Sequence, residues 1–325
     1  MSDIDLPSCS PALLQARADL NYKVREFFRM RQVLEVEVPI LASSFVTDPF
    51  IEPVTARNAG QTYYLQSSPE YAMKRLLADC QHCIYALTKV FRAGEHGSRH
   101  NPEFTMLEWY RVGLDDHALM AEVGDLVTQL MAEVVPQLSI YKLSYRQWFT
   151  QRWQIDPHTI ALADLRALGK SLIEIDDTGL DKDAWLDLLV THELEPSLPV
   201  GLTFVYDFPA SQAALARIVN DEQGTPVARR FEAYLASAPG KAMELANGYW
   251  ELTCAQEQRQ RFDRDLARRR ALGLPGYPVD ERLLGALARG IPTCAGVALG
   301  VDRLLMQQQG LKRISQTLSF DFSRA

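Results

Sequence analysis

The amino-acid sequence predicts an α+β domain built on an antiparallel β-sheet, and two observations lead to this fold class. The segments 84–92 and 103–111 have strand character, and the polar loop AGEHGSRHNP between them indicates a long antiparallel hairpin. Further strand patterns lie at 203–208, 229–235 and 241–246, and the chain shows no internal repeat. A single domain over 1–325, with helices flanking an antiparallel sheet, is the simplest arrangement.

The N-terminal part predicts a helix followed by a strand. Residues 11–32 place apolar side chains at helical spacing, among them Val24, Phe27 and Phe28. From residue 33 to Pro39, apolar and acidic residues alternate, which is strand periodicity. The other expected elements are a strand at 62–66, helices at 70–78 and 115–135, short helices within 140–200, and helices at 254–271, 280–289 and 302–309.

Composition restricts the class of protein. The chain has 325 residues, 47% hydrophobic and 23% charged, which is ordinary globular composition. A net charge of −7 lowers the expectation of tight, general nucleic-acid binding. Five cysteines do not suggest a disulfide framework, and Cys80 and Cys83 have no second pair at zinc-site spacing. The acidic start does not resemble a signal peptide, and no apolar run is long enough for a bilayer, so we expect a cytoplasmic protein with no membrane partner.

The hairpin loop and its edges concentrate polar chemistry. The residues concerned are Arg92, Glu95, His96, Arg99, His100, Asn101 and Glu103. Arginine offers a planar fork for phosphate and carboxylate oxygens, and a glycine-bearing loop lets backbone amides approach a nucleotide. A solvated hairpin tip is the alternative. On the second strand, Glu108 shares a face with Phe104, Met106 and Tyr110, where a carboxylate tends to be paired or to await a cation.

Two acidic segments permit either a structural or a binding role. In SSPEYAMKRLL, Ser68 and Pro69 can begin a helix with Glu70 in its first turn, or Glu70 can bind an ammonium group. In MELANGYWEL, Glu244 and Glu251 flank an expected turn at residues 247–248. The two carboxylates can hold Mg²⁺, which prefers oxygen ligands, or they can be surface charges.

The segment GVALGVDRLLM combines small residues with one arginine. Gly296, Ala298 and Gly300 let a strand approach another group closely, and Arg303 one turn into the next helix can reach a phosphate. A tight strand-to-helix turn with a surface charge is the structural alternative.

Taken in order, these segments resemble the catalytic core of class II aminoacyl-tRNA synthetases, and most of all the lysyl-tRNA synthetase branch. The first motif is the helix 11–32 with the strand ending at Pro39. The second runs from Phe91 and Arg92 through HNPEFTMLEWY, and the third from Gly296 to Arg303. The resemblance extends from about residue 11 to the end. It implies the class II fold, the use of ATP and Mg²⁺, and a homodimer formed through the first motif.

The resemblance also implies roles for individual residues. Arg92 resembles the arginine that bridges the substrate carboxylate and the α-phosphate, and Arg303 resembles the one at the γ-phosphate. The implied nucleotide contacts are Arg92, Ala93, Gly94, Glu95, Asn101, Glu244, Leu245, Gly300 and Arg303. The implied amino-acid pocket is Ser68, Pro69, Glu70, Glu108, Tyr110 and Glu251, with Glu244 and Glu251 as metal ligands. The family usually has an acid two residues after the arginine, where this chain has Gly94, so the adenine contact falls on Gly94 or Glu95.

The chemistry agrees with this assignment. A substrate with two ammonium groups requires several carboxylates, and Glu70, Glu108 and Glu251 supply them. Adenylate formation is the attack of a carboxylate on a phosphate, so cations such as Arg92 and Mg²⁺ must offset the repulsion. No base for a later acceptor amine is evident from the sequence.

Lysyl-tRNA synthetases carry an anticodon-binding barrel before this core, whereas only about ten residues precede the first helix here. The chain therefore resembles the stand-alone branch of the family, the elongation factor P–(R)-β-lysine ligases. That resemblance implies (R)-β-lysine as the activated amino acid, elongation factor P as the protein acceptor, and no stable tRNA binding. Two alternatives are an enzyme that charges tRNA with lysine through the acceptor stem, and a non-catalytic module that senses an amino acid. The presence of Arg92, Glu244 and Arg303 speaks against the second.

Position 298 yields the first prediction. Lysyl-tRNA synthetases have glycine where this chain has Ala298, and one methyl group in a tight pocket is worth about 1–3 kcal/mol of discrimination. We expect Ala298→Gly to increase ATP–pyrophosphate exchange with α-lysine relative to β-lysine. An exchange rate with α-lysine that does not increase would contradict this role of the methyl group.

Overall fold

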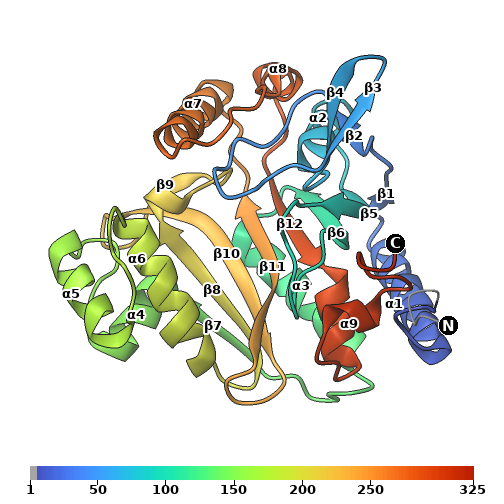
Figure 1. Cartoon of the computed structure of the whole chain (residues 1–325), viewed down its shortest axis with the longest axis horizontal. Coiled ribbons are helices and arrows are strands. Elements are labelled where there is room, and N and C mark those ends of the chain that lie inside the picture. Colours follow the sequence, from blue (N-terminus) through green and yellow to red (C-terminus); the bar gives the residue numbers. More distant parts are fainter. Residues whose placement is uncertain (1–5) are drawn as a thin grey trace.

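A computed structural model describes residues 6–325, and it shows a central sheet with helices on both faces (Figure 1). The strands of this sheet, in spatial order, are β1 (Leu34–Glu35), β5 (Ile84–Phe91), β6 (Glu103–Val112), β12 (Cys294–Gly300), β11 (Ala242–Trp250), β10 (Pro226–Ala236), β8 (Gly201–Pro209) and β7 (Ile140–Ser144). The short strand β9 (Ile218–Asn220) also pairs with β10. Only the two edge pairs, β1 with β5 and β7 with β8, are parallel. The predicted antiparallel hairpin and α+β class are therefore confirmed.

The remaining elements surround this sheet. A small second sheet consists of β2 (Leu41–Ala42), β4 (Gln61–Leu65) and β3 (Thr55–Asn58). The helices are α1 (Pro11–Met30), α2 (Glu70–Cys80), α3 (Asp116–Met131), α4 (Tyr145–Trp153), α5 (Leu162–Leu172), α6 (Lys182–Leu189), α7 (Ala255–Ala271), α8 (Glu281–Arg289) and α9 (Val301–Gln308). A π-helical turn, Val190–Leu194, continues α6. Across residues 6–325, no helix has the length and apolar character required to span a membrane.

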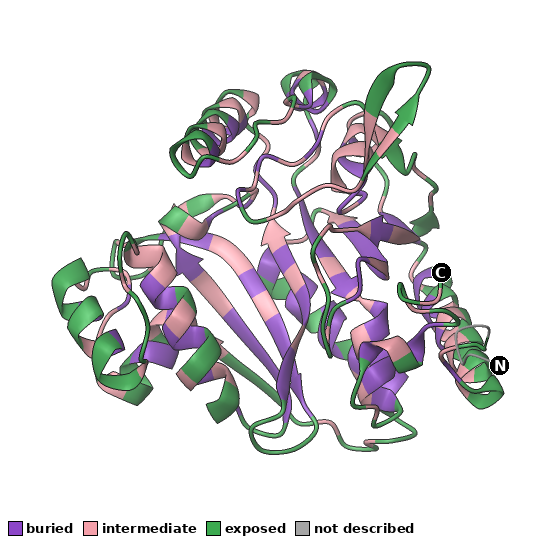
Figure 2. Cartoon of the chain, viewed as in Figure 1, coloured by how far each residue is buried: buried purple, intermediate pink, exposed green. Residues whose placement is uncertain are grey.

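The main core lies between one face of the sheet and helices α1, α3 and α9. Along β6, Leu107 and Trp109 are fully buried in this core, and Trp109 Nε1 donates to Glu122 Oε1 of α3 at 3.0 Å. Because side chains alternate along a strand, Glu108 and Tyr110 must point to the opposite face. Figure 2 shows buried residues concentrated along the central strands, with exposed residues on the outer helix α5. The alternation thus divides a packing face from a face with polar groups.

A second core covers the polar face at the β8–β10 end. It brings together aromatic and aliphatic residues of α4 and α6, such as Tyr145, Phe149 and Trp185, with Phe208 and Tyr234 of the sheet. Residues 140–200, the least informative part of the sequence, therefore form an insertion that packs onto the sheet beside its polar side chains (Figure 1).

Two sequence expectations about strands were wrong. Residues 247–248 do not form a turn, because β11 continues to Trp250 and pairs Asn247 with Ala298 and Gly248 with Val297. Gly248 allows close packing instead, since a Cβ atom there would lie 2.3 Å from the Phe231 ring. The strand expected at 33–38 is shorter than predicted. It consists of β1, which pairs in parallel with the start of β5.

Asp302 connects the three elements that carry the sequence motifs. It lies in the first turn of α9, is 1% exposed, and accepts a hydrogen bond from Thr105 N of β6 at 2.6 Å. Its other oxygen pairs with the Arg17 guanidinium of α1. Arg17 also donates to the Thr317 carbonyl at 2.9 Å. One carboxylate therefore fixes α1, β6 and α9 relative to one another.

We expect Asp302→Asn to lower the free energy of unfolding by roughly 3 kcal/mol, the low end for breaking a buried pair because Arg17 keeps its carbonyl bonds. Urea denaturation measures this change. Asp19→Asn, at an exposed site on α1, is the matched control and should change stability by less than about 0.5 kcal/mol. Equal stability of the two variants would refute the connecting role of Asp302.

Candidate active site

The predicted amino-acid pocket brings together side chains from β6 and from the start of α2. Glu108 is 2% exposed, and it accepts hydrogen bonds from Ser68 Oγ at 2.6 Å and from the Tyr110 hydroxyl at 2.8 Å. Burial, together with the negative charge of Glu70, raises the pKa of Glu108 to about 8. The carboxyl is oriented by two hydroxyl donors and lacks a cation close enough to restore its usual pKa.

A buried lysine, which the sequence reasoning missed, holds the other two carboxylates of this pocket. Lys74 Nζ lies 2.6 Å from Glu70 Oε1 and 2.6 Å from Glu251 Oε2. Burial by itself lowers the pKa of Lys74, but Glu251 and Glu70 raise it above its ordinary value, so the side chain is charged. The signal was present in the sequence, because Lys74 follows Glu70 by four residues between the buried residues Met73 and Leu77 of α2.

The formal charges explain which ligand the pocket suits. Glu70, Glu108 and Glu251 carry three negative charges when ionised, and Lys74 neutralises one of them. Two negative charges remain in a buried site, where an uncompensated charge is costly. A ligand with two ammonium groups supplies the missing positive charges, so the arrangement fits a diamino compound.

Gly296 is required beside this pocket. It lies on β12 opposite Tyr110, and a Cβ atom would stand 2.4 Å from Glu251 Oε1 and 2.4 Å from the Tyr110 ring. Any larger residue would displace both groups. Ala298, two residues along the same face, is paired with Glu108 and Asn247, so its methyl group belongs to the floor of the site.

Arginines gather beside the pocket at the hairpin loop. Arg303 Nη1 donates to the Glu244 carbonyl at 2.9 Å, and its Nη2 lies 2.8 Å from His100 Nε2. Burial and the Arg303 charge lower the pKa of His100, so the neutral ring accepts this hydrogen bond. Arg92 lies over the Phe104 ring at 5.2 Å, and its buried Nε has no partner among the described residues. An orphaned guanidinium donor suits an anionic ligand group.

The other implied nucleotide contacts have different surroundings. Asn101 donates to the Glu103 carbonyl at 2.6 Å and accepts from Phe322 N at 3.3 Å, so its amide anchors the loop to the C-terminal segment. This does not support the predicted nucleotide contact by Asn101. The Leu245 side chain is buried in the main core, which leaves only its backbone for a ligand.

In the rest of the hairpin loop, and at the starts of α2 and α9, the backbone lies where a ligand can approach it. Gly94 has a φ of +78°, which glycine adopts without strain, and Ala93 N donates to the Glu52 carbonyl at 2.9 Å. Glu95 is 3.5 Å from Arg92, so it competes for the fork that an anion would use. Pro69 and Gly300 are the N-cap residues of α2 and α9.

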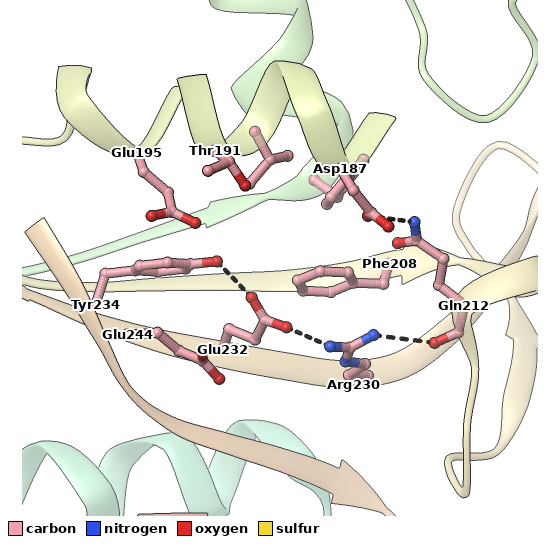
Figure 3. Close-up of a pocket in the computed structure, with 11 residues that line it drawn as sticks. Asp187, Thr191, Glu195, Phe208, Gln212, Arg230, Glu232, Tyr234 and Glu244 are labelled. Atoms are coloured by element: carbon pink, nitrogen blue, oxygen red, sulfur yellow. Dashed lines mark hydrogen bonds and ion pairs between the residues drawn. The ribbon is translucent and has the colours of Figure 1, made fainter. Parts of the chain in front are cut away.

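Glu244 and Glu251, the two metal ligands that the sequence predicts, lie at opposite ends of β11, and their part in metal binding stays a prediction. Glu244 lies near the start of β11, whereas Glu251 follows its end, and at about 3.3 Å per residue their Cα atoms are roughly 23 Å apart. Glu251 is moreover paired with Lys74. Glu232 of β10, which the sequence reasoning did not select, lines the same cavity as Glu244, as Figure 3 shows.

The pair Glu232 and Glu244 has the donor chemistry for Mg²⁺. Burial raises the pKa of Glu232 against the effect of Arg230, and the neighbouring Glu244 raises it further. Mg²⁺ takes oxygen ligands, uses one or two carboxylates and keeps several waters. The part of the chain that the structure describes has no cluster of three or more His, Cys, Asp or Glu side chains suited to a metal, so two carboxylates are the available set.

Comparison with known proteins agrees with this fold. The family model described as tRNA synthetases class II (D, K and N) matches residues 7–324. The chain therefore belongs to this family of class II synthetases. Its curated relatives include proteins named elongation factor P–(R)-β-lysine ligase from Pectobacterium carotovorum subsp. carotovorum (strain PC1), 44% identical, and from Proteus mirabilis (strain HI4320), 45% identical. Each alignment covers 98% of both chains.

The raised pKa of Glu108 predicts a pH-dependent affinity for the diamino acid. Because the neutral carboxyl cannot pair with an ammonium group, affinity for (R)-β-lysine should rise as pH increases from 6 to 8, by up to about tenfold per pH unit. Calorimetry measures this. Glu108→Gln should weaken binding and flatten the profile, whereas Glu103→Gln, on the outer part of the same strand, should preserve both. Equal affinity at pH 6 and pH 8 in the unmodified protein would rule the mechanism out.

Proposed function

We propose that this protein activates (R)-β-lysine as an adenylate, using ATP and Mg²⁺, and transfers it to a lysine side chain of elongation factor P. The observation that carries the proposal is the pocket around Glu108, where three buried or half-buried carboxylates share one internal cation, Lys74. Relatives with that printed activity, at 44–45% identity over nearly the whole chain, support it. We also propose that it is a ligase of the cytoplasm without stable tRNA binding.

The residues present fit the binding of both substrates. The two ammonium groups of β-lysine pair with Glu108 and with the Glu70–Glu251 side of the pocket, next to Lys74. Ser68 and Tyr110 hold the Glu108 carboxylate in place. The substrate carboxylate is then directed toward Arg92, whose Nε is available.

The nucleotide belongs over β6, β11 and β12, with its phosphates near Arg92 and Arg303. Arg303 is held by Glu244 and His100, so its guanidinium is positioned before ligand binds. Glu232 and Glu244 would hold Mg²⁺. When bound, this ion offsets the negative charge of the phosphates.

The reaction follows from these positions. A carboxylate oxygen of β-lysine forms a bond to the α-phosphorus while the bond to the bridging oxygen of pyrophosphate breaks. Arg92 stabilises the charge that develops on the α-phosphate, which is the type of contribution worth about 10²–10³ in rate. In the second step the acceptor amine, after losing a proton, attacks the carbonyl carbon and AMP leaves.

We propose that the protein acts as a homodimer through α1. Support comes from three exposed apolar side chains on this helix, Leu14, Tyr22 and Met30, which water solvates unfavourably in a monomer. Dimerisation would bury them.

The function is tested by product mass. The protein is incubated with ATP, either (R)-β-lysine or α-lysine, and either purified elongation factor P or bulk tRNA. We expect a β-lysyl mass gain on elongation factor P, abolished or reduced about 10²–10³-fold in Arg92→Ala and preserved in Arg57→Ala, an exposed arginine on β3. A mass gain on tRNA with none on elongation factor P would replace the proposal with tRNA charging.

A further inference from the structure

A cavity under the insertion shares Glu232 and Glu244 with the proposed nucleotide site, and its other lining residues have no part in the proposed adenylate formation. Its volume is about 160 Å³, and it lies between α6 with its π-helical turn and strands β8, β10 and β11, open to solvent on one side (Figure 3). The floor carries Glu232 and Glu244. The roof carries Asp187 and Glu195. Glu244 belongs to both regions, because its carboxylate is also 3.5 Å from Arg303.

The charges of this cavity favour a cation. Four carboxylates line it, and the guanidinium of Arg230 is the one cationic group among the described residues that line it. Arg230 is already engaged with Glu232 and with the Gln212 carbonyl at 3.2 Å. Burial raises the pKa of Glu195 to about 7, which shows that its negative charge is poorly compensated.

A second and independent observation points to a ligand. The Tyr145 side chain lines the cavity and is 1% exposed, yet its hydroxyl has no hydrogen-bond partner among the described residues. A buried hydroxyl without a partner is costly, and such a group marks a position where a polar ligand atom completes the structure.

The walls decide what kind of cation fits. Phe208 and Val190 line the cavity between the acidic groups, and the Tyr145 ring packs against Phe208 with centroids 4.8 Å apart. A bare or hydrated metal ion gains nothing from apolar walls, whereas an alkylammonium ion places its methylene stem against them and its head among carboxylates. The volume also exceeds that of a single ion.

We propose that this cavity binds a primary alkylammonium group, with its head among the carboxylates that line the cavity. Two sources have this chemistry, the lysine side chain of a protein acceptor and a free diamine. The first source rests on the proposed transfer function and would place the acceptor lysine beside Glu244 at the edge of the nucleotide site. The second is independent of that function.

Direct binding is the first test. Calorimetry with n-pentylamine and with Nα-acetyl-lysine methylamide, at pH 8, should give saturable binding to the unmodified protein. Glu195→Gln and Tyr145→Phe should each weaken it, by about tenfold for the loss of the charge. Glu193→Gln, two residues earlier and paired with Arg152 at the surface, is the matched control. No saturable binding, or binding that Glu195→Gln and Tyr145→Phe leave unchanged, would overturn the proposal.

A kinetic test distinguishes an acceptor lysine from a free diamine as the source of the amine. It also distinguishes failure of the cavity proposal from failure of the proposed function. ATP–pyrophosphate exchange with (R)-β-lysine reports adenylation, and mass gain of elongation factor P reports transfer. For an acceptor site, Glu195→Gln and Tyr145→Phe should leave exchange within about twofold and raise the KM for elongation factor P about tenfold. Weaker amine binding with unchanged transfer assigns the cavity to a free diamine and overturns the acceptor role. Absence of exchange in the unmodified protein defeats the proposed function, while the calorimetric result still decides the cavity.

Discussion

The structure depends on the buried carboxylate of Asp302, because three elements from distant parts of the chain meet at it. Its two oxygens serve α1 through Arg17 and β6 through the amide of Thr105, while its backbone begins α9. The next residue, Arg303, is the one that α9 presents to the site. Since β6 also carries Glu108 and Tyr110, the register fixed by Asp302 sets the distance between the arginine end and the carboxylate end of the site. A buried charge is stable only while its partners stay in place, so this arrangement tolerates little displacement.

The amino-acid pocket uses an internal cation to define its specificity. Without Lys74, three buried carboxylates would repel one another and would protonate before binding anything. With Lys74 between Glu70 and Glu251, the pocket remains folded and still lacks two positive charges. Selection for a diamino compound then follows from charge balance, and the steric limits at Gly296 and Ala298 act on the position of the amino groups.

The insertion between β7 and β8 gives the same sheet a second role. Its aromatic core packs on β8 and β10, and in doing so it closes a cavity over carboxylates that otherwise belong to the nucleotide site. Glu232 and Glu244 are therefore shared between two neighbouring binding regions. In the proposed reaction, such sharing would place the adenylate and an incoming amine close together and keep the amine apart from the amino-acid pocket.

Local patterns in the sequence determined the antiparallel hairpin, the helices and most of the amino-acid pocket. Strand alternation was sufficient to place Glu108 and Tyr110 on one face, because the period of two holds wherever the strand is regular. The two arginine-bearing motifs are contiguous in the sequence, and they led to the expectation that Arg92 and Arg303 bind anionic groups. The described residues place Glu108, Tyr110 and Ser68 in one hydrogen-bonded group.

Only the tertiary structure decided the groups that depend on pairing across elements. The proximity of Glu232 and Glu244 arises from the contact of β10 with β11, whereas the sequence analysis expected a turn at 247–248 between Glu244 and Glu251. Lys74 acquired its role because α2 packs its buried stripe against Glu251, a contact between residues far apart in the chain. The cavity lined by Glu195 exists because the segment between β7 and β8, whose sequence has no clear periodicity, folds onto β8 and β10. Sequence fixes which side chains alternate or recur within an element, whereas three-dimensional packing selects which elements meet and thus which charges compensate one another.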